Sequence, residues 1–590
     1  MKIRSLIFAL ALGCSTLVNA ASNNIAPDLL AMNPATVVEA IVQYKTAPST
    51  AEVDAVRALG GKVNIQFKVI PALAVTLPAG SFVVLAKDPK IVYISPDRVV
   101  KRALDYAEPT VGALTAFQNG YDGTGIGIAI IDSGVTAHPD LNNSRGFPRV
   151  VFSMDFTWSG NNGDAYGHGD HVAGILAGDA VESVGPLYTH TFRGIAPNVN
   201  LINLKVLDAT GTGSDSQVIW AIETAIMLKN TFNIRVINLS LGRPVSESYT
   251  LDPLCQAVEQ AWTSGIVVVA SAGNGGRDNS YGTNGYGTIT APGNDPLVIT
   301  VGAMKDQRTL TRSDDTIASY SSKGPTLFDH VVKPDLVAPG NLIISLLAPN
   351  SNLVTTYPGN IIPLSYYENT ISTGKSPYYF TLSGTSMAAP MVSGTAALML
   401  QKDPTLSPDT VKARLMKTAS KNFPAFSTVT DPATGISYTS QYDIFTVGAG
   451  YLESWSALND GDKATGIAAS PIATYNSKTH EVYVVNANTA LWGSTALWGS
   501  TALWGSTALW GSTALWGSTA IWGSSVWVNS GTALWGSTAL WGSTAIWGSA
   551  ANSGSSTVNG FTALWGSTAL WGSTTVESSQ TSLISITGEP

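Results

Sequence analysis

The sequence is poor in cysteine, with two in 590 residues, Cys14 and Cys255. We expect Cys14 to be removed with an N-terminal signal, which leaves Cys255 alone in the mature chain. One cysteine cannot form an intramolecular disulfide, so a disulfide-stapled secreted scaffold is excluded. The segment from Pro253 to Val258 has a helical pattern, and we expect Cys255 to be a buried, inert thiol.

Charged residues are also scarce, at 12% of the chain, with 32 basic and 40 acidic side chains. The net charge of −8 is mild for this length. It argues against a nucleic-acid partner, which would call for a basic surface. It suits an exported protein that acts in solution.

Long hydrophobic runs are absent. The run from Leu6 to Leu12 is much shorter than the roughly 20 residues that span a membrane, so we expect no transmembrane segment. Lys2 and Arg4 precede this run, and small residues lead up to Ala20, which is the pattern of a secretory signal peptide. The alternative is a lipoprotein signal ending before Cys14, which the short apolar run fits poorly.

Three short segments carry residue types that work together in nucleophilic catalysis. A serine hydroxyl is a poor nucleophile at neutral pH, so it needs a histidine to take its proton and a carboxylate to orient that histidine. The chain order Asp, His, Ser is one of the few known for such triads. The segments are Ile130-Ile131-Asp132-Ser133-Gly134, Gly167-His168-Gly169-Asp170-His171-Val172-Ala173-Gly174 and Ser383-Gly384-Thr385-Ser386-Met387-Ala388-Ala389-Pro390.

Together these segments resemble the subtilisin-like serine proteases, or subtilases, and the resemblance covers about residues 110–460. It implies that Ser386 is the nucleophile, that His168 is the general base and that Asp132 orients the histidine. Asn274 matches the family's side-chain donor to the oxyanion. The implied reaction is endopeptidase cleavage of protein or peptide substrates through an acyl-enzyme, and its chemistry requires no cofactor.

The resemblance also implies a substrate-binding surface. Ser240, Leu241 and Gly242 match the segment that pairs with the substrate backbone as an added strand. Ala272 and Gly273 match a wall of the specificity pocket, and small residues there leave room for a large side chain. We therefore expect apolar or aromatic residues to be preferred before the scissile bond.

Other residues of these motifs receive structural interpretations. His171 is expected to be structural, and so is the subtilase-like segment from Lys333 to Gly340. The family usually has threonine at Asp170. A carboxylate there either perturbs the pKa of His168 or faces solvent, and we favour the solvent-facing interpretation. Asp140 matches a calcium-binding position of many relatives, yet six to eight oxygen ligands cannot be assigned, so a structural calcium ion stays open without ligands.

Residues 37–101 are predicted to form an α/β unit. Strands are expected over Val37 to Tyr44, Val63 to Ile70, Ala72 to Leu77 and Ile91 to Ile94, with helices from Ser49 to Leu59 and from Gly80 to Ala86. This β-α-β-β-α-β order suggests a ferredoxin-like fold. It resembles the subtilase propeptide, which implies assistance in folding and inhibition until cleavage between about Lys101 and Gly112.

Near-continuous apolar strands alternate with helix-length segments in the next part of the chain, and this alternation predicts a parallel sheet covered on both faces. Active sites form outside the carboxyl ends of such strands, where Asp132, Asn238 to Gly242 and Asn274 are expected. The predicted strands are Ile126 to Ile131, Leu201 to Val206, Arg235 to Leu239, Gly265 to Ala270 and Leu297 to Val301, with helices over Ser216 to Leu228 and Leu254 to Thr263.

A tryptophan repeat follows. Thr-Ala-Leu-Trp-Gly-Ser recurs with a six-residue period over residues 489–573, where 12 of the 16 tryptophans lie, and no charged residue occurs between Glu481 and Glu577. An even period places every Trp on one side of an extended chain, so we favour a stacked all-β repeat. Disordered low-complexity chain, attachment to a cell surface or polymer, and self-association are the alternatives.

The sequence thus predicts a secreted endopeptidase made as a self-inhibited precursor, with its own propeptide as inhibitor. One alternative is a surface or assembly protein whose repeat is the main functional part and whose peptidase serves only self-processing. Another is a non-peptidase serine hydrolase, although the Gly-x-Ser-x-Gly elbow of such enzymes does not surround Ser386. The predicted divisions are signal 1–20, propeptide 37–101, peptidase domain 110–460, linker 461–488, repeat 489–573 and tail 574–590.

Overall fold

The computed structural model describes residues 24–30, 32–67, 70–96, 103–104, 106–280, 282–432, 434–476, 481–485, 525–529 and 588–589. The predicted signal over residues 1–20 lies outside them, as does the repeat apart from residues 525–529. The chain divides into two compact units between Arg102 and Ala103.

The first unit is a four-stranded antiparallel sheet in the order β2-β3-β1-β4, with helices between its strands. Its elements are α1 (Pro27–Leu30), β1 (Val37–Tyr44), α2 (Thr50–Ala58), β2 (Lys62–Gln66), β3 (Ala72–Pro78), α3 (Ala79–Leu85) and β4 (Ile91–Pro96). Ser49 and Glu52 form a capping box that starts α2. From β1 onward the observed order is the predicted β-α-β-β-α-β sequence of elements, although β2 ends earlier than expected.

The second unit is built on an eight-stranded sheet in the order β13-β12-β11-β10-β6-β9-β7, with β14 paired to β12. All pairs are parallel except β12 with β13. Every residue of β6, β11 and β12 is buried, which requires cover on both faces and confirms the predicted parallel sheet. The strands are β6 (Gly127–Asp132), β7 (Val150–Asp155), β9 (Asn200–Lys205), β10 (Ile234–Leu239), β11 (Val267–Ser271), β12 (Ile299–Lys305), β13 (Thr316–Ile317) and β14 (Leu336–Pro339).

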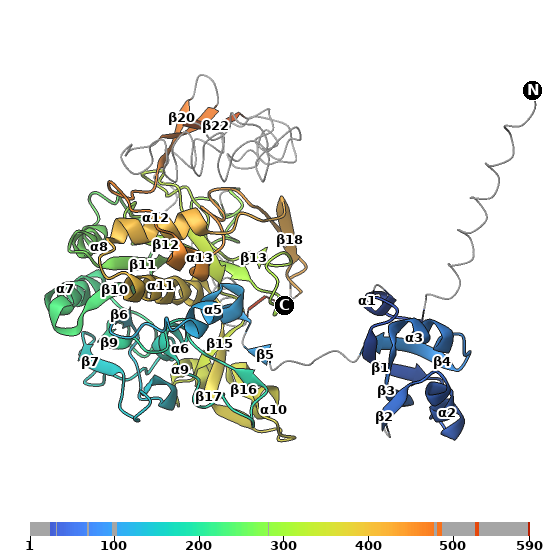
Figure 1. Ribbon diagram of the computed structural model, residues 1–590. Helices are drawn as coiled ribbons and strands as arrows, with labels where there is room; N and C mark the ends of the chain where they lie inside the picture. Colours follow the sequence, from blue (N-terminus) through green and yellow to red (C-terminus); the bar gives the residue numbers. More distant parts are fainter. Residues whose placement is uncertain are drawn as a thin grey trace, which may run out of the picture. The chain divides into compact units, whose positions relative to one another are not determined.

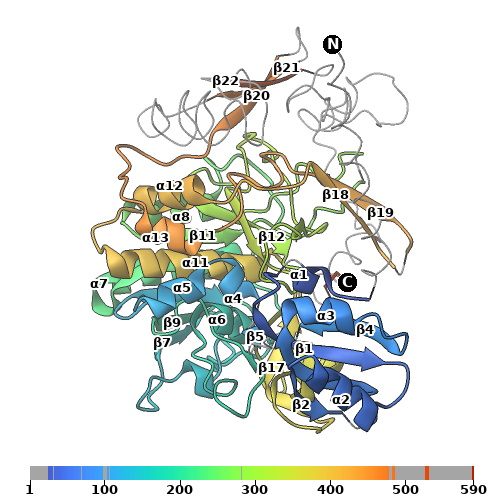
Figure 2. The same cartoon turned by 45° about the vertical axis from the view of Figure 1, so that its right-hand side comes forward.

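Two groups of helices cover this sheet. Helix α11 packs on β10, β11, β12 and β14 and against α6, whereas α7 and α8 pack together on β6, β9, β10 and β11. Helices α5 and α13 lie beside α11 (Figures 1 and 2). The helices are α4 (Ala107–Thr110), α5 (Ala113–Gln118), α6 (Gly169–Ala177), α7 (Asp215–Phe232), α8 (Pro253–Thr263), α9 (Asn352–Thr356), α10 (Leu364–Tyr367), α11 (Thr385–Lys402), α12 (Pro408–Thr418) and α13 (Ser454–Asn459), with 3₁₀ turns η1 (Pro139–Leu141) and η2 (Pro358–Asn360).

Smaller antiparallel sheets surround this core, together with one short parallel pair, β5 with β8. Two strands, β20 and β21, occur within residues 461–488, the expected linker. Strand β20 pairs with β21, and β21 pairs with β22, which falls in an irregular interruption of the hexapeptide rather than in a regular copy. The strands are β5 (Ala103–Leu104), β8 (His190–Thr191), β15 (Ile343–Leu346), β16 (Ile361–Pro363), β17 (Lys375–Leu382), β18 (Phe426–Thr430), β19 (Ser437–Gln441), β20 (Ile472–Asn476), β21 (Glu481–Val485) and β22 (Ser525–Asn529).

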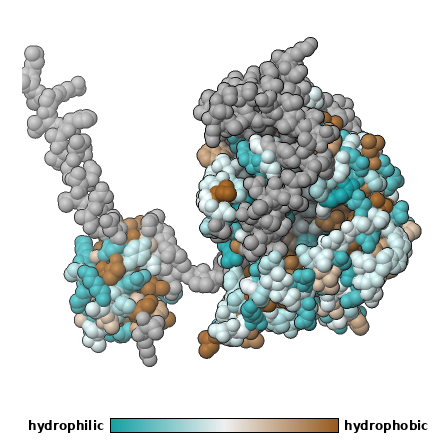
Figure 3. Space-filling model, turned by 180° about the vertical axis from the view of Figure 1, so that it is seen from behind, coloured by the Kyte–Doolittle hydropathy of each residue, from teal (hydrophilic) through white to brown (hydrophobic). Residues whose placement is uncertain are grey.

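The described surface is mixed in character. On the face seen in Figure 3, apolar residues are scattered among polar ones, an arrangement that is ordinary for a soluble domain. Within the residues that the structure describes, no helix has the length and hydropathy needed to cross a membrane.

Candidate active site

Asp132 and His168 come together where the end of β6 packs against the start of α6. Strand β6 ends at Asp132, and His168 is the residue that precedes the first turn of α6. A Cβ atom at Gly169 would lie 2.1 Å from the carbonyl oxygen of Gly134. Because only glycine allows this approach, Gly169 lets the start of α6 pack directly on the turn that follows Asp132.

The imidazole of His168 is oriented by the Asp132 carboxylate. His168 Nδ1 lies 2.8 Å from Asp132 Oδ1, and the Asp132 side chain is fully buried while that of His168 is 16% exposed. Burial lowers the pKa of His168, but the charge and hydrogen bond of Asp132 and the charge of Asp164 outweigh it, so the net pKa is raised above 6.5. With Nδ1–H directed at Asp132, the other nitrogen, Nε2, is left to accept a proton.

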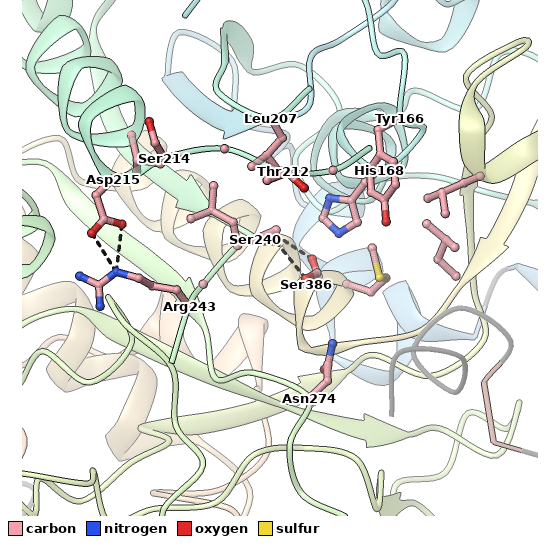
Figure 4. A pocket seen from close by; sticks show the side chains of 18 of the residues that line it. Tyr166, His168, Leu207, Thr212, Ser214, Asp215, Ser240, Arg243, Asn274 and Ser386 are labelled. Carbon is pink, nitrogen blue, oxygen red and sulfur yellow. Dashed lines mark hydrogen bonds and ion pairs between the residues drawn. The ribbon is translucent and has the colours of Figure 1, made fainter. Parts of the chain in front are cut away.

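Ser386 lies in the first turn of α11. Its Oγ donates a hydrogen bond to the carbonyl oxygen of Ser240 at 2.9 Å, and Ser240 Oγ donates to the Ser386 carbonyl at 2.7 Å. Figure 4 shows His168 and Ser386 on facing sides of one cleft, and no direct hydrogen bond joins them among the described interactions. Catalytic hydrogen bonds are often long in free enzymes, so a role for Ser386 as nucleophile would require its Oγ to turn from Ser240 to His168.

Asn274 is fixed beside Ser386 by its amide oxygen. Asn274 Oδ1 accepts hydrogen bonds from Thr385 N–H at 2.9 Å and from the Thr385 hydroxyl at 3.2 Å. The amide nitrogen is thereby turned toward Ser386 (Figure 4). The first turn of α11 has N–H groups without intrahelical acceptors and the positive end of a helix dipole. Asn274 and α11 thus direct donors to the same region beside Ser386.

These groups lie in a cleft of about 450 Å³. Most of the predicted site residues line this cleft, whereas Asp132 lies buried beneath His168. The predicted residues that line it are His168, Ser240, Leu241, Gly242, Asn274 and Ser386.

Ala272 and Gly273, predicted to form a wall of the specificity pocket, are not among the residues lining this cleft. Ala272 is fully buried. Gly273 N–H donates a hydrogen bond to Thr385 Oγ1 at 3.1 Å. In this structure Gly273 therefore contacts the turn that carries Ser386.

Residues 211–215 also line the cleft, and the sequence analysis did not predict this. Arg243 fixes the position of this segment. Arg243 Nε lies 2.9 and 2.8 Å from the two carboxylate oxygens of Asp215, and its Nη2 lies 2.8 and 2.9 Å from those of Asp252. The glycine-rich segment Gly211-Thr212-Gly213 follows β9 at the carboxyl edge of the sheet. That position was a signal for a binding loop.

The solvent-facing interpretation of Asp170 is wrong. Asp170 is 1% exposed. The backbone of Thr136 covers it and donates an N–H hydrogen bond to Asp170 Oδ1 at 2.6 Å. Asp170 N–H in turn donates to Asp164 Oδ2 at 2.8 Å. Burial and the nearby charge of Asp164 raise the pKa of Asp170 well above its usual value.

The two carboxyl groups differ in their hydrogen bonding. Asp164 accepts bonds from Ser133 Oγ and from three backbone N–H groups, those of Tyr166, Gly167 and Asp170. Asp170 Oδ2, by contrast, is buried and has no partner among the described residues. We assign the negative charge to Asp164 and the retained proton to Asp170, since hydrogen bonds to a carboxylate favour its charged form.

This assignment predicts a pH effect. As a general base, His168 would have to be neutral, and because the pKa of His168 is raised above its usual value, activity is expected to appear at a higher pH than an ordinary histidine would give. Asp164 contributes to that rise, so Asp164→Asn is expected to move the acid limb of the kcat/KM profile to lower pH. The measurement is kcat/KM against pH with a neutral peptide substrate.

Asp170→Asn is the matched control, because it replaces a group that is already neutral, and its acid limb is expected to stay in place. An Asp164→Asn limb that stays fixed or moves to higher pH would contradict the assigned charges. The position of the limb does not depend on how much of each variant folds.

The structural interpretations of three other residues are confirmed. His171 is buried, and its Nε2 lies 3.0 and 3.1 Å from the carbonyl oxygens of Ile343 and Phe380. Lys333 forms a buried ion pair with Asp335 at 2.8 Å. Cys255 is fully buried, and burial raises the pKa of its thiol.

Asp140 does not fit a calcium ligand. Its carboxylate accepts a hydrogen bond from Glu182 N–H at 3.0 Å and one from the Tyr379 hydroxyl at 2.7 Å. Burial raises the pKa of Asp140 to about 7. Among the residues covered by the structure, no group of three or more His, Cys, Asp or Glu side chains is arranged to hold a metal ion.

Comparison with known proteins agrees with this geometry. Residues 123–442 match the profile described as the Subtilase family. Serine protease AprX of Bacillus subtilis (strain 168) is 39% identical over 328 residues, which are 54% of this chain and 67% of AprX. Subtilisin E of the same strain is 35% identical over 382 residues, 64% of this chain and 83% of that protein. An alkaline protease of Alkalihalobacillus alcalophilus is 35% identical over 357 residues, 60% and 75% of the two chains.

Proposed function

The chain belongs to the subtilase family and is a serine endopeptidase, and from that premise we propose that Asp132, His168 and Ser386 form its catalytic triad. The observation that carries the proposal is the contact of 2.8 Å between His168 Nδ1 and Asp132 Oδ1 beneath a cleft that also contains Ser386. We further propose that the enzyme is secreted as a precursor.

Acylation begins when Ser386 Oγ attacks the carbonyl carbon of the substrate. His168 Nε2 takes the hydroxyl proton, and the charge of Asp132 stabilises the imidazolium that forms. The tetrahedral intermediate then collapses, the carbon–nitrogen bond breaks, and His168 returns the proton to the leaving amine. Water attacks the resulting ester by the same route, which releases the acid product and restores Ser386.

The substrate lies between two segments of backbone. Residues 240–242 follow β10, where the chain leaves the sheet, and residues 211–214 line the same cleft. An extended peptide can pair with either segment through main-chain hydrogen bonds, which suits many sequences. Ala272 and Gly273 remain proposed parts of the pocket for the residue before the scissile bond, where we propose an apolar or aromatic preference.

Asn274 stabilises the oxyanion, and its loss has a defined kinetic signature. Asn274→Ala is expected to lower kcat by about 10²–10³-fold with little change in KM, because the donor acts mainly in the transition state. The measurement is kcat and KM on one peptide substrate. An unchanged kcat, or a loss confined to KM, would show that Asn274 only positions Thr385.

The first unit is proposed to be the propeptide. Its β-α-β-β-α-β elements immediately precede the peptidase unit in the chain. On this proposal it assists folding and inhibits the enzyme until the chain is cut between about Lys101 and Gly112. The signal over residues 1–20 is proposed to direct export.

The test compares hydrolysis of casein and of a simple ester by the purified chain, with and without residues 489–573. Cleavage of casein at equal rates by both forms is expected for a general endopeptidase. Loss of casein cleavage without the repeat would assign the repeat a direct part in substrate capture. Hydrolysis of the ester alone would contradict the proposed function.

A further inference from the structure

Gly588 and Glu589 occupy a buried position on the peptidase unit, far in sequence from every residue they contact. Glu589 is 1% exposed, and both residues belong to the second compact unit. Figure 1 shows this segment in red beside the label C. A carboxylate is costly to bury unless charge and hydrogen bonds compensate it, so its surroundings indicate a built site.

The Glu589 carboxylate has charged and polar partners. Oε1 lies 2.9 Å from Arg277 Nη2 and accepts the backbone N–H of Ser319 at 2.9 Å and also the Ser319 hydroxyl. Arg277 is itself buried, and its Nη1 lies 2.8 Å from Asp431 Oδ2. Charge-assisted bonds of this kind are among the stronger ones in proteins.

The backbone of Glu589 is recognised separately. Asn341 Oδ1 accepts the Glu589 N–H at 2.8 Å, and Asn341 Nδ2 donates to the Glu589 carbonyl at 3.0 Å. Asn341 is itself 5% exposed. One side-chain amide therefore satisfies both backbone groups, as a neighbouring β-strand would.

Glycine is required at position 588, which precedes Glu589. Gly588 has a φ of +77°, a conformation that other residues adopt at a cost. A Cβ atom there would lie 2.3 Å from Leu342 Cδ2 and 2.7 Å from Ser383 Oγ. Together with the contacts of Glu589, this close fit makes the site selective for a Gly-Glu pair.

The site adjoins the nucleophile turn. Asn341 and Leu342 follow Gly340, whose carbonyl accepts Gly384 N–H at 2.8 Å, and Leu342 N–H donates to Ser383 Oγ at 2.8 Å. Ser383 also lines the cleft.

The chain that enters the repeat is attached to the same unit at its other end. Val332 N–H donates to the Pro471 carbonyl at 2.8 Å, and Ala473 N–H donates to the His330 carbonyl at 2.8 Å. The tryptophan repeat of residues 489–573 lies in sequence between this attachment and Glu589.

We propose that Arg277, Ser319, Asn341 and Leu342 form a binding site for a Gly-Glu segment, that its occupant is Gly588-Glu589 of the same chain, and that the repeat is thereby anchored at both ends on the peptidase unit. The site fastens the far end of the repeat without a covalent bond. A chain cut within the repeat therefore keeps its distal fragment.

The test uses the full chain with Ser386→Ala, so that its own activity does not alter it, and with the recognition sequence of a specific protease inserted between Ser555 and Ser556. After cleavage, the fragment that ends at Pro590 is expected to co-elute with the peptidase unit in size-exclusion chromatography. Glu589→Ala and Gly588→Ala are each expected to release it. Glu577→Ala, a second acidic residue of the tail, is the matched control and is expected to retain it.

Hydrogen exchange on the uncut chain provides an independent measurement. Because Ser319 N–H donates to Glu589, Glu589→Ala is expected to speed exchange of that amide by about tenfold or more, and Glu577→Ala is expected to leave it unchanged. Equal exchange in the two variants, or a fragment that elutes alone from the unsubstituted chain or stays bound after Glu589→Ala, would overturn the proposal.

Discussion

Ser386→Ala is expected to lower kcat for peptide hydrolysis by roughly 10⁶-fold, the loss that follows removal of the serine from a triad of this type. The reason is that Ser386 is the proposed nucleophile and lies in one cleft with His168 and Asn274. The same variant is expected to remain an unprocessed precursor, since no acyl-enzyme can form at the cleavage site between Lys101 and Gly112. Turnover of a fluorogenic peptide measures the first effect, and intact mass measures the second.

The Ser386 side chain contributes one hydrogen bond, to Ser240, so its loss is expected to change the melting temperature little. A thermal melt that matches that of the unsubstituted chain establishes that the variant is folded. Residual turnover within tenfold of the unsubstituted chain would remove Ser386 from the role of nucleophile. Normal maturation of the variant would show instead that another protease cuts the precursor.

Asp132→Asn is expected to lower kcat by about 10⁴-fold with the fold preserved. The carboxylate now accepts the Nδ1–H of His168 at 2.8 Å. An amide nitrogen in its place would donate to Nδ1, so the ring would carry its proton on Nε2 and could not accept one from Ser386. The loss should appear in kcat rather than in KM, because Asp132 is buried and does not reach the substrate.

The control for Asp132→Asn is Asp170→Asn, which makes the same change at a neighbouring buried carboxyl group to which we assign a retained proton, because its pKa is raised. If both variants lost activity equally, the effect of Asp132→Asn would reflect the buried carboxyl network as a whole and not the tautomer of His168.

Local patterns predicted most of the framework. The helix start at Ser49 and the all-buried strands β6, β11 and β12 follow from short stretches of sequence, because capping and strand burial depend on neighbouring residues. The segments that hold Asp132, His168 and Ser386 could also be recognised locally, because each is a short sequence motif.

The surroundings of the site depend on contacts between distant parts of the chain, so no local pattern reveals them. Asp170 was assigned to solvent because its cover comes from Thr136, 34 residues earlier. Asp140 matches a calcium-binding position by its local motif, whereas its partner Tyr379 is 239 residues away. The place of Glu589 beside Arg277, 312 residues apart, lies beyond any periodicity or motif.

The most direct test of the central claim is labelling of the full chain with a fluorophosphonate, read by intact mass and by peptide mapping. The account predicts one label per chain, located on Ser386, and none on Ser386→Ala. A folded, unsubstituted chain that takes no label, or that takes it on another serine, would contradict the assignment of Ser386, His168 and Asp132 as the catalytic triad.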